Sequence, residues 1–338
     1  MKYPIKETRE KMRQIGLRPN IYNNMVVAAE AFDRGIKVST SGTRGTRINM
    51  EHEGRRHFWR LGTNSLNHRL AIRCADMKEI TSRLLRSANV AAPENTIFGA
   101  DDKKRAWAWA EPVTPVVVKP ADGLQGTDVY VDISDWETFS AAFDRVAQSK
   151  SEVLVERFHP GQDHRILVID NQVVAATRRI AANVTGDGTS TISELIEAKN
   201  QTRRRIHKRL AVDDIVINYL NKRGHTLDSI PAARDHVQLR GTANLHTGGD
   251  AMDATDLLTA EQIRLAEEAS RAIPGLRVAG FDMLISDSGE GAVLEINSNP
   301  MISMHHFPWV GEVRDAASAL LNAMFPATAR PLRKPANA

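Results

Sequence analysis

Two apolar segments that carry acidic and amide side chains impose the strongest constraint on this chain. Residues 280–283 (GFDM) and, after a glycine-containing turn, residues 293–300 (VLEINSNP) each have the character of a buried strand. Side chains two residues apart on a strand face the same side, so Glu295 and Asn297 share a face that Asp282 can join. Three oxygen donors of this kind suit Mg²⁺, which phosphate oxygens usually complete. The alternative is that Asp282 and Glu295 are solvated acids at strand ends.

A second constraint is the run 115–120 (PVVVKP), which precedes a loop containing Gly123 and Gly126. The β-branched residues predict a buried strand that ends at Lys119, and the glycines let backbone N–H groups approach an anion. The order strand, glycine loop, strand differs from both the P-loop and the dinucleotide fingerprint, which open a helix. Alone, such a lysine is more often a surface residue. Together with the downstream acids, the pattern favours phosphate binding.

In their order and spacing these segments resemble the ATP-grasp ligases, and within them the domain shared by the cyanophycin synthetases and the bifunctional glutathione synthetases. The resemblance spans roughly residues 60–325 and includes the segments 76–78 (DMK), 154–158 (LVERF), 161–165 (GQDHR), 186–188 (GDG) and 243–249 (ANLHTGG). It implies an α/β fold with α+β lobes, in which ATP lies between two lobes that follow a small N-terminal domain.

We therefore predict four parts: a preATP-grasp-like domain over 1–74, a small lobe with the glycine loop over 75–152, a large lobe over 153–326 that contains a polar insertion (186–250), and a flexible tail over 327–338. Helical spacing predicts helices over 25–34, 77–87, 135–146, 192–200 and 313–325. Strands are predicted near 37–39, 57–60, 116–119, 129–131, 153–157, 165–169 and 173–178, with a hairpin turn at 170–171. Ser190 or Thr191 can cap the helix over 192–200, with Glu194 completing a capping box.

The resemblance also implies a reaction, the ATP-dependent joining of a carboxylate to an amine through an acylphosphate. Phosphoryl transfer needs charge neutralisation and alignment more than a protein nucleophile. The implied ATP-binding residues are Lys78 and Lys119 for the phosphates, Gly123, Gly126 and Thr127 for a loop closing over them, Glu156, Arg157 and Phe158 for the adenine, and Asp163 for the ribose. The implied Mg²⁺ ligands, with Mn²⁺ as an alternative ion, are Asp282, Glu295 and Asn297.

Four further residues are candidates for the chemistry. Arg178 or Arg179 can stabilise the transferring phosphoryl group or the tetrahedral intermediate, because a guanidinium presents a planar fork to oxyanions. Arg240 and Asn244 can bind a substrate carboxylate or phosphate, although a polar loop with ordinary turn glycines is the alternative. In the D-alanyl-D-alanine ligase branch an arginine stands two residues before the metal aspartate, and here that residue is Gly280. An arginine from another element must serve, or the mechanism relies on it less, and D-alanyl-D-alanine ligase is disfavoured.

Composition indicates the class of protein and the compartment that we expect for it. The chain has 338 residues, of which 42% are hydrophobic and 25% charged, which is ordinary for a globular protein. No apolar run reaches the length of a membrane span, and the N-terminus lacks a signal core, so we expect a cytoplasmic protein with no membrane partner. The single cysteine, Cys74, excludes an internal disulfide. We expect a homodimer.

Partners are predicted from charge. The formal net charge is +4, and the densest basic run is 203–209 (RRRIHKR). It lacks interleaved aromatics, and no helix-turn-helix or zinc-finger pattern accompanies it, which argues against nucleic acid. A solvated helix face is the default interpretation, and a patch that receives an acidic substrate is the alternative. The expected substrates are amino acids or short peptides, including acidic ones.

Two other classes of function stay open from the sequence. An ATP-grasp kinase or thiol ligase would retain the same ATP residues, and a catalytically silent nucleotide-binding module would be expected to lack one of them. His305 and His306 follow a loop that passes near the acceptor substrate in related enzymes. They can orient an amine or a carboxylate, or simply pack in the core.

Overall fold

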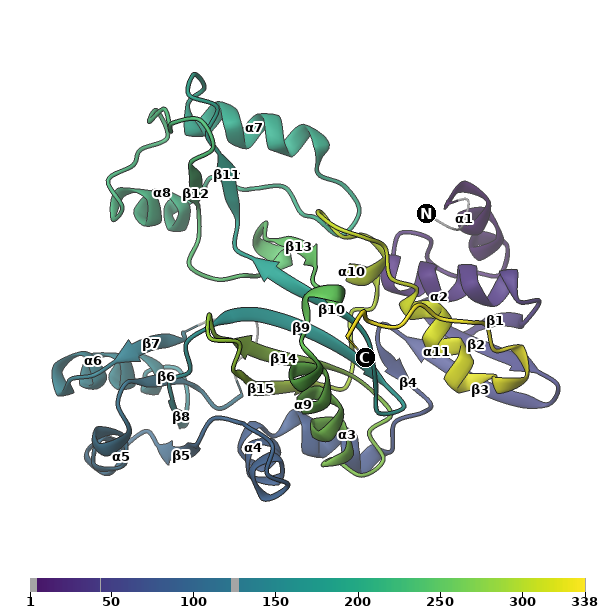
Figure 1. Cartoon of the computed structure of the whole chain (residues 1–338), viewed down its shortest axis with the longest axis horizontal. Coiled ribbons are helices and arrows are strands. Elements are labelled where there is room, and N and C mark those ends of the chain that lie inside the picture. Colours follow the sequence, from purple (N-terminus) through teal and green to yellow (C-terminus); the bar gives the residue numbers. More distant parts are fainter. Residues whose placement is uncertain (1–4, 43, 123–127, 338) are drawn as a thin grey trace.

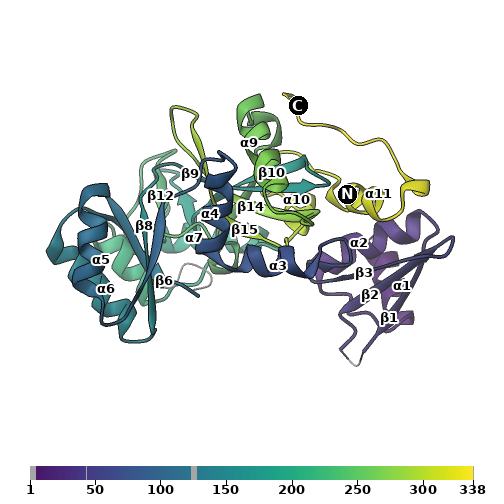
Figure 2. The ribbon, with the colours of Figure 1, turned by 90° about the horizontal axis from the view of Figure 1, so that it is seen from below.

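The computed structural model describes residues 5–42, 44–122 and 128–337. Gly123, Gly126 and Thr127 of the predicted phosphate loop lie outside these ranges. Within them the chain forms four sheets flanked by helices, which is the predicted mixed α/β architecture (Figure 1). Figure 2 shows the small-lobe sheet and the N-terminal sheet at opposite ends of the molecule, with the largest sheet between them.

The N-terminal part combines two helices with a four-stranded sheet. Its elements are α1 (Ile5–Gln14), α2 (Tyr22–Asp33), β1 (Lys37–Ser41), β2 (Arg47–His52), β3 (Arg55–Arg60) and β4 (Thr63–Asn64). Ile48, Met50 and Trp59 are buried in one cluster with α2 and with the C-terminal helix α11 (Ala316–Met324). The sequence patterns do not predict β2, because its two apolar residues make an alternation too short to stand out.

The small lobe is a sheet in the order β5-β8-β6-β7 with helices on one face. Its elements are β5 (Asn95–Gly99), α5 (Lys103–Ala110), the 3₁₀ turn η1 (Glu111–Val113), β6 (Val116–Pro120), β7 (Tyr130–Ile133), α6 (Trp136–Ala147) and β8 (Glu152–Arg157). Val116 and Val118 pack under Phe139 and Phe143 of α6. Since side chains alternate along a strand, Lys119 lies on the opposite face of the sheet, away from α6.

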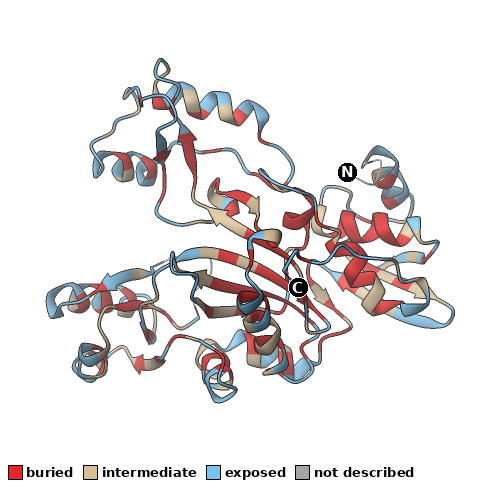
Figure 3. Ribbon diagram, viewed as in Figure 1, coloured by how far each residue is buried: buried red, intermediate tan, exposed pale blue. Residues whose placement is uncertain are grey.

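The central sheet has the order β13-β10-β9-β14-β15. Its strands are β9 (Gln162–Ile169), β10 (Gln172–Ile180), β13 (Asp250–Asp253), β14 (Val278–Ile285) and β15 (Gly291–Asn297). On one face, residues including Ile166 and Phe281 pack against helices α3 (Arg69–Asp76) and α9 (Ala260–Arg271). On the other face, Leu167 and Val278 join the N-terminal cluster. Figure 3 shows buried stretches in these strands, separated by partly buried residues.

Helix α4 (Lys78–Ser87) follows α3 and packs beside β15, and the predicted helix over 77–87 is confirmed. Helix α6 has Asp135 as its N-cap, accepting from the Thr138 N–H at 2.8 Å, which confirms the predicted helix over 135–146 to within one residue. At the predicted hairpin, Asp170 and Asn171 both have positive φ, as a tight turn between β9 and β10 requires.

The insertion holds a two-stranded sheet and two helices. These elements are β11 (Asn183–Thr185), α7 (Ile192–Thr202), α8 (Asp214–Asn221) and β12 (His236–Gln238). The 3₁₀ turns η2 (Leu245–Thr247) and η3 (Thr255–Leu257) flank β13. Thr191 caps α7 and forms a capping box with Glu194, so the predicted box is confirmed. Figure 1 places this insertion apart from the central sheet, joined to it through the end of β10 and through β13.

The interpretation of residues 203–209 as a solvated helix face is wrong. Helix α7 ends at Thr202, and the segment that follows is not helical. Arg203 is buried, with its guanidinium bonded to Asp250 at 2.6 Å and to the carbonyl oxygens of Gly248 and Gly249. Because these acceptors lie in the interior, Arg203 is buried with them. Only residues 204, 205, 208 and 209 of the run are exposed.

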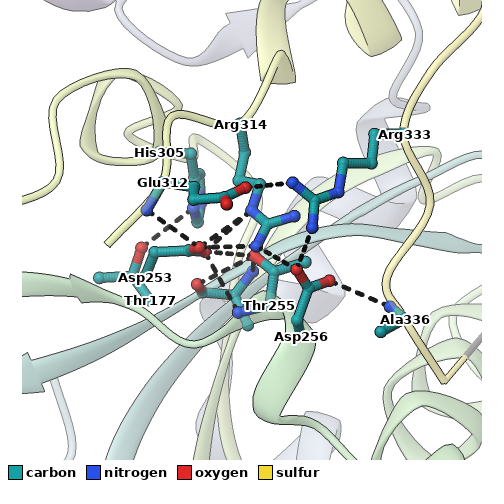
Figure 4. A network of polar contacts seen from close by, with 10 residues as sticks. Thr177, Asp253, Thr255, Asp256, His305, Glu312, Arg314, Arg333 and Ala336 are labelled. Carbon is teal, nitrogen blue, oxygen red and sulfur yellow. Dashed lines mark hydrogen bonds and ion pairs between the residues drawn. The ribbon is translucent and has the colours of Figure 1, made fainter. Parts of the chain in front are cut away.

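The C-terminal part ends in α10 (Ser303–His306), α11 and the 3₁₀ turn η4 (Pro326–Thr328). The helix predicted over 313–325 begins later, at Ala316, because Arg314 turns away to form ion pairs with Asp253 and Asp256. Residues of the predicted flexible tail also reach this network: Arg333 contacts Asp256 at 2.6 Å, and the Ala336 N–H donates to the same carboxylate (Figure 4). The predicted domain boundaries stay a prediction.

A buried asparagine joins the N-terminal part to the central sheet. Asn67, between β4 and α3, donates to the carbonyl oxygens of Val278 at 2.7 Å and Ser298 at 3.2 Å. Its side-chain oxygen accepts from the N–H groups of Arg277 and Val278 at 2.9 and 2.8 Å. One amide thus fixes the start of β14 and the residue that follows β15, the two strands that carry the predicted metal ligands.

We expect Asn67→Ala to lower the free energy of unfolding by about 1–3 kcal/mol, because buried backbone groups lose their partners. Asn218→Ala, which removes an exposed amide from α8, is the matched control and should change stability by less than about 0.5 kcal/mol. Urea unfolding of both variants measures the difference, and equal midpoints for the two would contradict the role given to Asn67.

Candidate active site

The strand register aligns a row of polar residues across the central sheet. Residues directly opposite each other in antiparallel strands share a face. The paired positions run from strand to strand in the order Asp253, Thr177, Arg165, Asp282 and Glu295. Gly280 stands opposite Asn297, two residues along β14 on the same face. The three residues predicted to bind a metal are therefore brought together on one face of two neighbouring strands.

Asp282 is the centre of this row. Its carboxylate accepts from Arg165 Nε, from Arg165 Nη2 at 3.1 Å and from Arg179 Nη2 at 3.0 Å. Burial raises the pKa of Asp282, but the two guanidiniums outweigh that effect and hold the pKa below its ordinary value. The carboxylate is therefore charged and fixed in orientation before any ligand arrives.

Asp163, predicted to bind the ribose, belongs to the same cluster. Arg179 donates hydrogen bonds to its carboxylate from Nε at 3.0 Å and from Nη2 at 2.7 and 2.8 Å. Burial raises the pKa of Asp163 and the neighbouring Asp282 adds to the rise, although Arg179 opposes it. Two acids and two guanidiniums thus compensate each other in a largely buried space.

The register also separates the two candidate arginines. Arg178 stands opposite His164, and Arg179 stands opposite Ala251, so the two side chains leave β10 on opposite faces. Arg179 is the one that faces Asp282. Between Arg178 and Arg179, only Arg179 is brought to the acid row in the described part of the chain.

Arg240 and Asn244 lie in the insertion and have local partners. Arg240 is buried and bonds to Asp213, which is the N-cap of α8. The Asn244 side chain caps η2 by accepting from the His246 N–H at 2.8 Å, and its carbonyl accepts from the Gly249 N–H. Among the residues that the structure describes, neither side chain is hydrogen-bonded to Asp282 or Arg179. Their predicted roles toward substrate stay predictions.

The lysines predicted to contact the phosphates lie near acids. Lys119 Nζ bonds to Glu156, the residue predicted at the adenine, at 2.6 Å, and Asn95 donates to the other oxygen of Glu156 at 3.3 Å. Lys78 opens α4 and approaches Glu295 to 4.0 Å. Of the other predicted adenine contacts, Arg157 is exposed and Phe158 is half-buried, with its N–H bonded to the Pro115 carbonyl. One predicted phosphate-binding lysine, Lys119, is thus paired with the predicted adenine residue Glu156, and the other, Lys78, with the predicted metal ligand Glu295.

The donor set of Asp282, Glu295 and Asn297 fits a magnesium ion. No group of three or more His, Cys, Asp or Glu side chains suited to a metal occurs in the described ranges. A site with two carboxylates and an amide is what Mg²⁺ accepts when phosphate oxygens and water supply the rest. A metal would bind this amide through Oδ1, and Nδ2 of Asn297 is buried without a hydrogen-bond partner among the described residues.

The two histidines are packed in the interior. His305 Nδ1 lies 3.0 Å from Oγ1 of Thr177, which stands opposite Arg165 in the polar row. His306 Nε2 accepts from the Ala317 N–H at 3.0 Å. Both side chains are buried. Of the two sequence interpretations, the core position is the one that the structure shows, and His305 still touches the row through Thr177.

A pocket of about 410 Å³ opens between the insertion and β13, at the end of β10. Three polar residues of its lining are bonded to one another: Lys199 Nζ donates to Asp250 at 2.6 Å and to both the carbonyl and side-chain oxygens of Asn183. Trp309 closes one wall, with Lys199 5.6 Å from its ring centre. The ion cluster anchors the insertion to the central sheet, and this is the only role that its contacts support.

Arg165 is the residue that the sequence patterns miss. It lies within the segment 161–165, but the resemblance gives it no role. The one feature of the sequence that could have indicated Arg165 is Gly280. A glycine two residues before a buried acid leaves room that a long side chain from a neighbouring strand can fill. Which strand neighbours β14 is decided by the sheet order, which the sequence does not give.

Comparison with known proteins identifies the domain. Residues 73–224 match the family described as the RimK-like ATP-grasp domain. This chain carries a RimK-like ATP-grasp domain. Over 270 residues it is 37% identical to the cyanophycin synthetase of Trichormus variabilis, a match that covers 76% of this chain and 30% of the relative. The Synechocystis cyanophycin synthetase is 38% identical over 271 residues, 76% of this chain and 31% of that protein.

The bifunctional glutathione biosynthesis proteins are similar over much of the same length. The protein from Pasteurella multocida is 31% identical over 266 residues, which is 74% of this chain and 35% of the relative. The crystal structure of a bifunctional glutathione synthetase from that organism superimposes with a TM-score of 0.72 at 26% identity, covering 90% of this chain and 43% of that one. The ATP-grasp fold is thereby confirmed. This chain spans about a third of the length of these relatives.

His305 is expected to make the stability of the fold depend on pH, because its pKa differs between the folded and unfolded chain. Burial, the neighbouring His306 and the charge of Arg165 lower the pKa of His305 from 6.5 to about 3. Because the unfolded chain takes up this proton more readily, the stability from the neutral histidine is complete above pH 6.5 and is lost as the pH falls toward 3.

From pH 7 to pH 5 we expect the wild-type free energy of unfolding to fall by about 2 kcal/mol more than that of His305→Gln. Urea unfolding of both proteins at the two pH values measures this difference. The same pH dependence in both proteins would show that His305 is not held neutral by the fold.

Proposed function

We propose that this ATP-grasp chain is a ligase that joins the carboxylate of an amino acid or peptide to an amine through an acylphosphate, releasing ADP and phosphate. The observation that carries the proposal is the charged row of the central sheet, in which Asp282 lies between Arg165 and Arg179 and beside Glu295. Phosphoryl transfer from ATP to a carboxylate brings two anions together, and such a reaction depends on fixed positive charge.

Each predicted residue has a part in this reaction. Lys119 and Lys78 hold the ATP phosphates, with Gly123, Gly126 and Thr127 as the covering loop. Glu156 and the backbone of Arg157 and Phe158 receive the adenine, and Asp163 the ribose. Support for this grouping comes from two ion pairs, Lys119 with Glu156 and Lys78 with Glu295, which bring together residues from four elements.

Asp282, Glu295 and Asn297 would hold Mg²⁺, or Mn²⁺ in its place. When bound, the ion would neutralise phosphate charge and help to align the transferred group. Glu295 is suited to this role because its side chain is only partly buried and has Lys78 at 4.0 Å as its ion-pair partner. Arg179, which holds Asp163 and Asp282 together, would keep the ribose and metal positions at a fixed separation.

The substrates that we propose are amino acids or short peptides, with glutamate- or aspartate-containing acyl donors first. The net charge of +4 and the exposed basic side chains of residues 204, 205, 208 and 209 support an acidic substrate. The similarity to a cyanophycin synthetase and to a glutathione biosynthesis bifunctional protein supports a ligase but does not identify the donor and acceptor. In the described residues no helix has the length and apolarity to cross a membrane.

The reaction is tested by incubating the chain with ATP, Mg²⁺ and pools of amino acids and short peptides. We expect ADP and phosphate to form together with a new amide, and Glu295→Gln to lower turnover at least about 100-fold, because a metal ligand contributes several kcal/mol to the barrier. Glu290→Gln, an exposed acid in the turn before β15, is the control and should react normally.

The products separate the other classes of function. AMP with pyrophosphate would indicate adenylation, and a phosphorylated product without an amide would make the protein a kinase. Mass spectrometry identifies the products in each case. A thioester product would indicate a thiol ligase, and ATP binding without any turnover would indicate a silent module.

The ATP site is tested separately with Lys119→Met. We expect this variant to bind ATP at least about tenfold more weakly, since a charge-assisted contact contributes about 1.5–3 kcal/mol. It should also unfold more easily, because the buried Glu156 loses its partner. Lys103→Met is the matched control, since Lys103 forms an ion pair of 2.7 Å with Asp144 in the same lobe. Calorimetric titration with ATP that gives one affinity for both variants would exclude Lys119 from the site.

A further inference from the structure

The N-terminal sheet has one face that packs in the core and one face that lies open. Ile48, Met50 and Trp59 on the packed face are buried with α2 and α11. Side chains at the intervening positions point the other way, because successive residues of a strand alternate between faces. There they form a shallow cavity of about 330 Å³, whose lining includes Lys37, Arg47, Asn49, Glu51, Arg56 and Phe58.

Positive charge is concentrated around this open face. Residues 37–60 contain six lysine or arginine residues and two glutamates, an excess of four positive charges, and the formal net charge of the whole chain is also +4. Glu51 is the acid of the lining, and it is already paired with Arg56, whose Nε lies 3.4 Å from its carboxylate. Among the described residues Lys37 and Arg47 have no ion-pair partner, so two cations of the face are left uncompensated.

Arg47 is held in place on this face by two contacts. Its guanidinium carbon lies 3.9 Å from the centre of the Phe58 ring, and its Nε donates to Asn49 Oδ1 at 3.0 Å. A guanidinium that is already stacked and bonded loses less freedom when its other edge binds an oxyanion. In the described part of the chain the Nη atoms of Arg47 make no hydrogen bond, so this edge can receive a carboxylate.

The spacing of the two uncompensated cations indicates the shape of the ligand. Lys37 stands opposite Glu51, and Ser41 stands opposite Arg47, so the two cations lie four residues apart along neighbouring strands. At about 3.3 Å per residue, their separation along the strand direction is about 13 Å. In an extended peptide, side chains four residues apart share a face and have the same separation. Acidic residues at positions i and i+4 of such a peptide would meet both cations.

We propose that the open face of the N-terminal sheet is a docking surface for an extended acidic segment of a partner polypeptide, in which carboxylates four residues apart pair with Lys37 and Arg47. The inference goes beyond the proposed function, because none of these residues belongs to the acid row or to the proposed ATP site.

Two other occupants fit this face less well. Proteins that bind single-stranded nucleic acid stack its bases on aromatic rings, and here Arg47 already stacks on Phe58. Glu51 would also repel a phosphate backbone. A second copy of the chain would bring the same excess of cations against itself, which opposes association. Charge complementarity therefore favours an acidic polypeptide.

Fluorescence anisotropy with labelled synthetic peptides tests the docking without ATP. The probe is a nine-residue peptide of serine and threonine with glutamates at positions 3 and 7. The reference peptide has the same composition, with glutamates at positions 3 and 6, which lie on opposite faces of an extended chain. At low ionic strength we expect the wild type to bind the probe at least about threefold more tightly than the reference, and added salt to reduce this difference.

Variants of the sheet locate the binding. Lys37→Met and Arg47→Met should each weaken probe binding at least about threefold, because each removes one charge-assisted contact. Arg55→Met is the matched control. Arg55 is an exposed arginine of the same sheet, but it stands opposite His52, on the other face, and its loss should leave probe binding unchanged.

Glu51→Gln provides a change in the opposite direction. Removing this carboxylate ends its repulsion of the probe and releases Arg56 from its ion pair. We expect this variant to bind the probe at least about twofold more tightly than the wild type. A variant that was merely damaged in folding would not gain affinity, so the two directions together separate docking from stability.

The remaining outcomes overturn the inference. Equal affinities for probe and reference, no binding of either, or normal binding by both Lys37→Met and Arg47→Met would exclude this docking. A single-stranded oligonucleotide that binds more tightly than the probe, and is weakened by the same variants, would make the face a nucleic-acid site. A dimer in sedimentation that Arg47→Met dissociates would assign the face to a second copy. None of these results affects the proposed ligase reaction, because neither ATP nor the acid row takes part in them.

Discussion

The buried carboxylate of Asp282 is the group on which the rest of this structure depends. Removing a carboxylate from water costs several kcal/mol unless opposite charge and hydrogen bonds replace the lost solvation. Arg165 and Arg179 provide both, from the two strands that follow one another through the hairpin at residues 170–171. The charge of Asp282 is therefore compensated only because the strand order is β10-β9-β14, which places both arginines near it.

The same principle governs the small lobe and the insertion. Glu156 is buried beside Lys119, and Asp250 is buried between Lys199 and Arg203. In each place an acid joins segments that are far apart in the sequence, and at least one cation neutralises its charge. The first pair lies at the predicted nucleotide site, and a nucleotide bound there as we propose would exchange protein contacts for phosphate contacts. The second cluster, of Asp250 with Lys199 and Arg203, fixes the insertion to β13 through contacts within the protein.

The N-terminal part contributes through hydrogen bonds from neutral amides. Asn67 holds the start of β14 and the residue after β15, and Asn23 of α2 donates to the Pro300 carbonyl and accepts from the Ser303 N–H. Asn67 thus reaches the backbone before β14 and after β15, and Asn23 reaches the loop after β15. Backbone groups in these loops would otherwise be left without partners, so the N-terminal part determines how precisely the acid row is held.

The sequence by itself determined the local elements and the types of residue at the site. The β-branched run ending in Lys119, the helix cap at Thr191 and the alternation of Glu295 with Asn297 are decided by neighbours within a few residues, and such patterns can be read directly. The resemblance to ATP-grasp ligases also came from the order of short segments, because order along the chain is a property of sequence.

Only the tertiary structure decided which of these residues meet. Arg178 and Arg179 are adjacent and chemically identical, and strand register alone turns Arg179 toward Asp282. From the sequence, Arg203 is expected at the surface because it belongs to a basic run. In the structure it is buried and bonded to Asp250, which is 47 residues away. The position of Arg165 over Gly280 joins residues 115 apart, which follows from β9 lying beside β14. Such pairings depend on sheet order and burial, which are set by the packing of the whole chain and not by any local pattern.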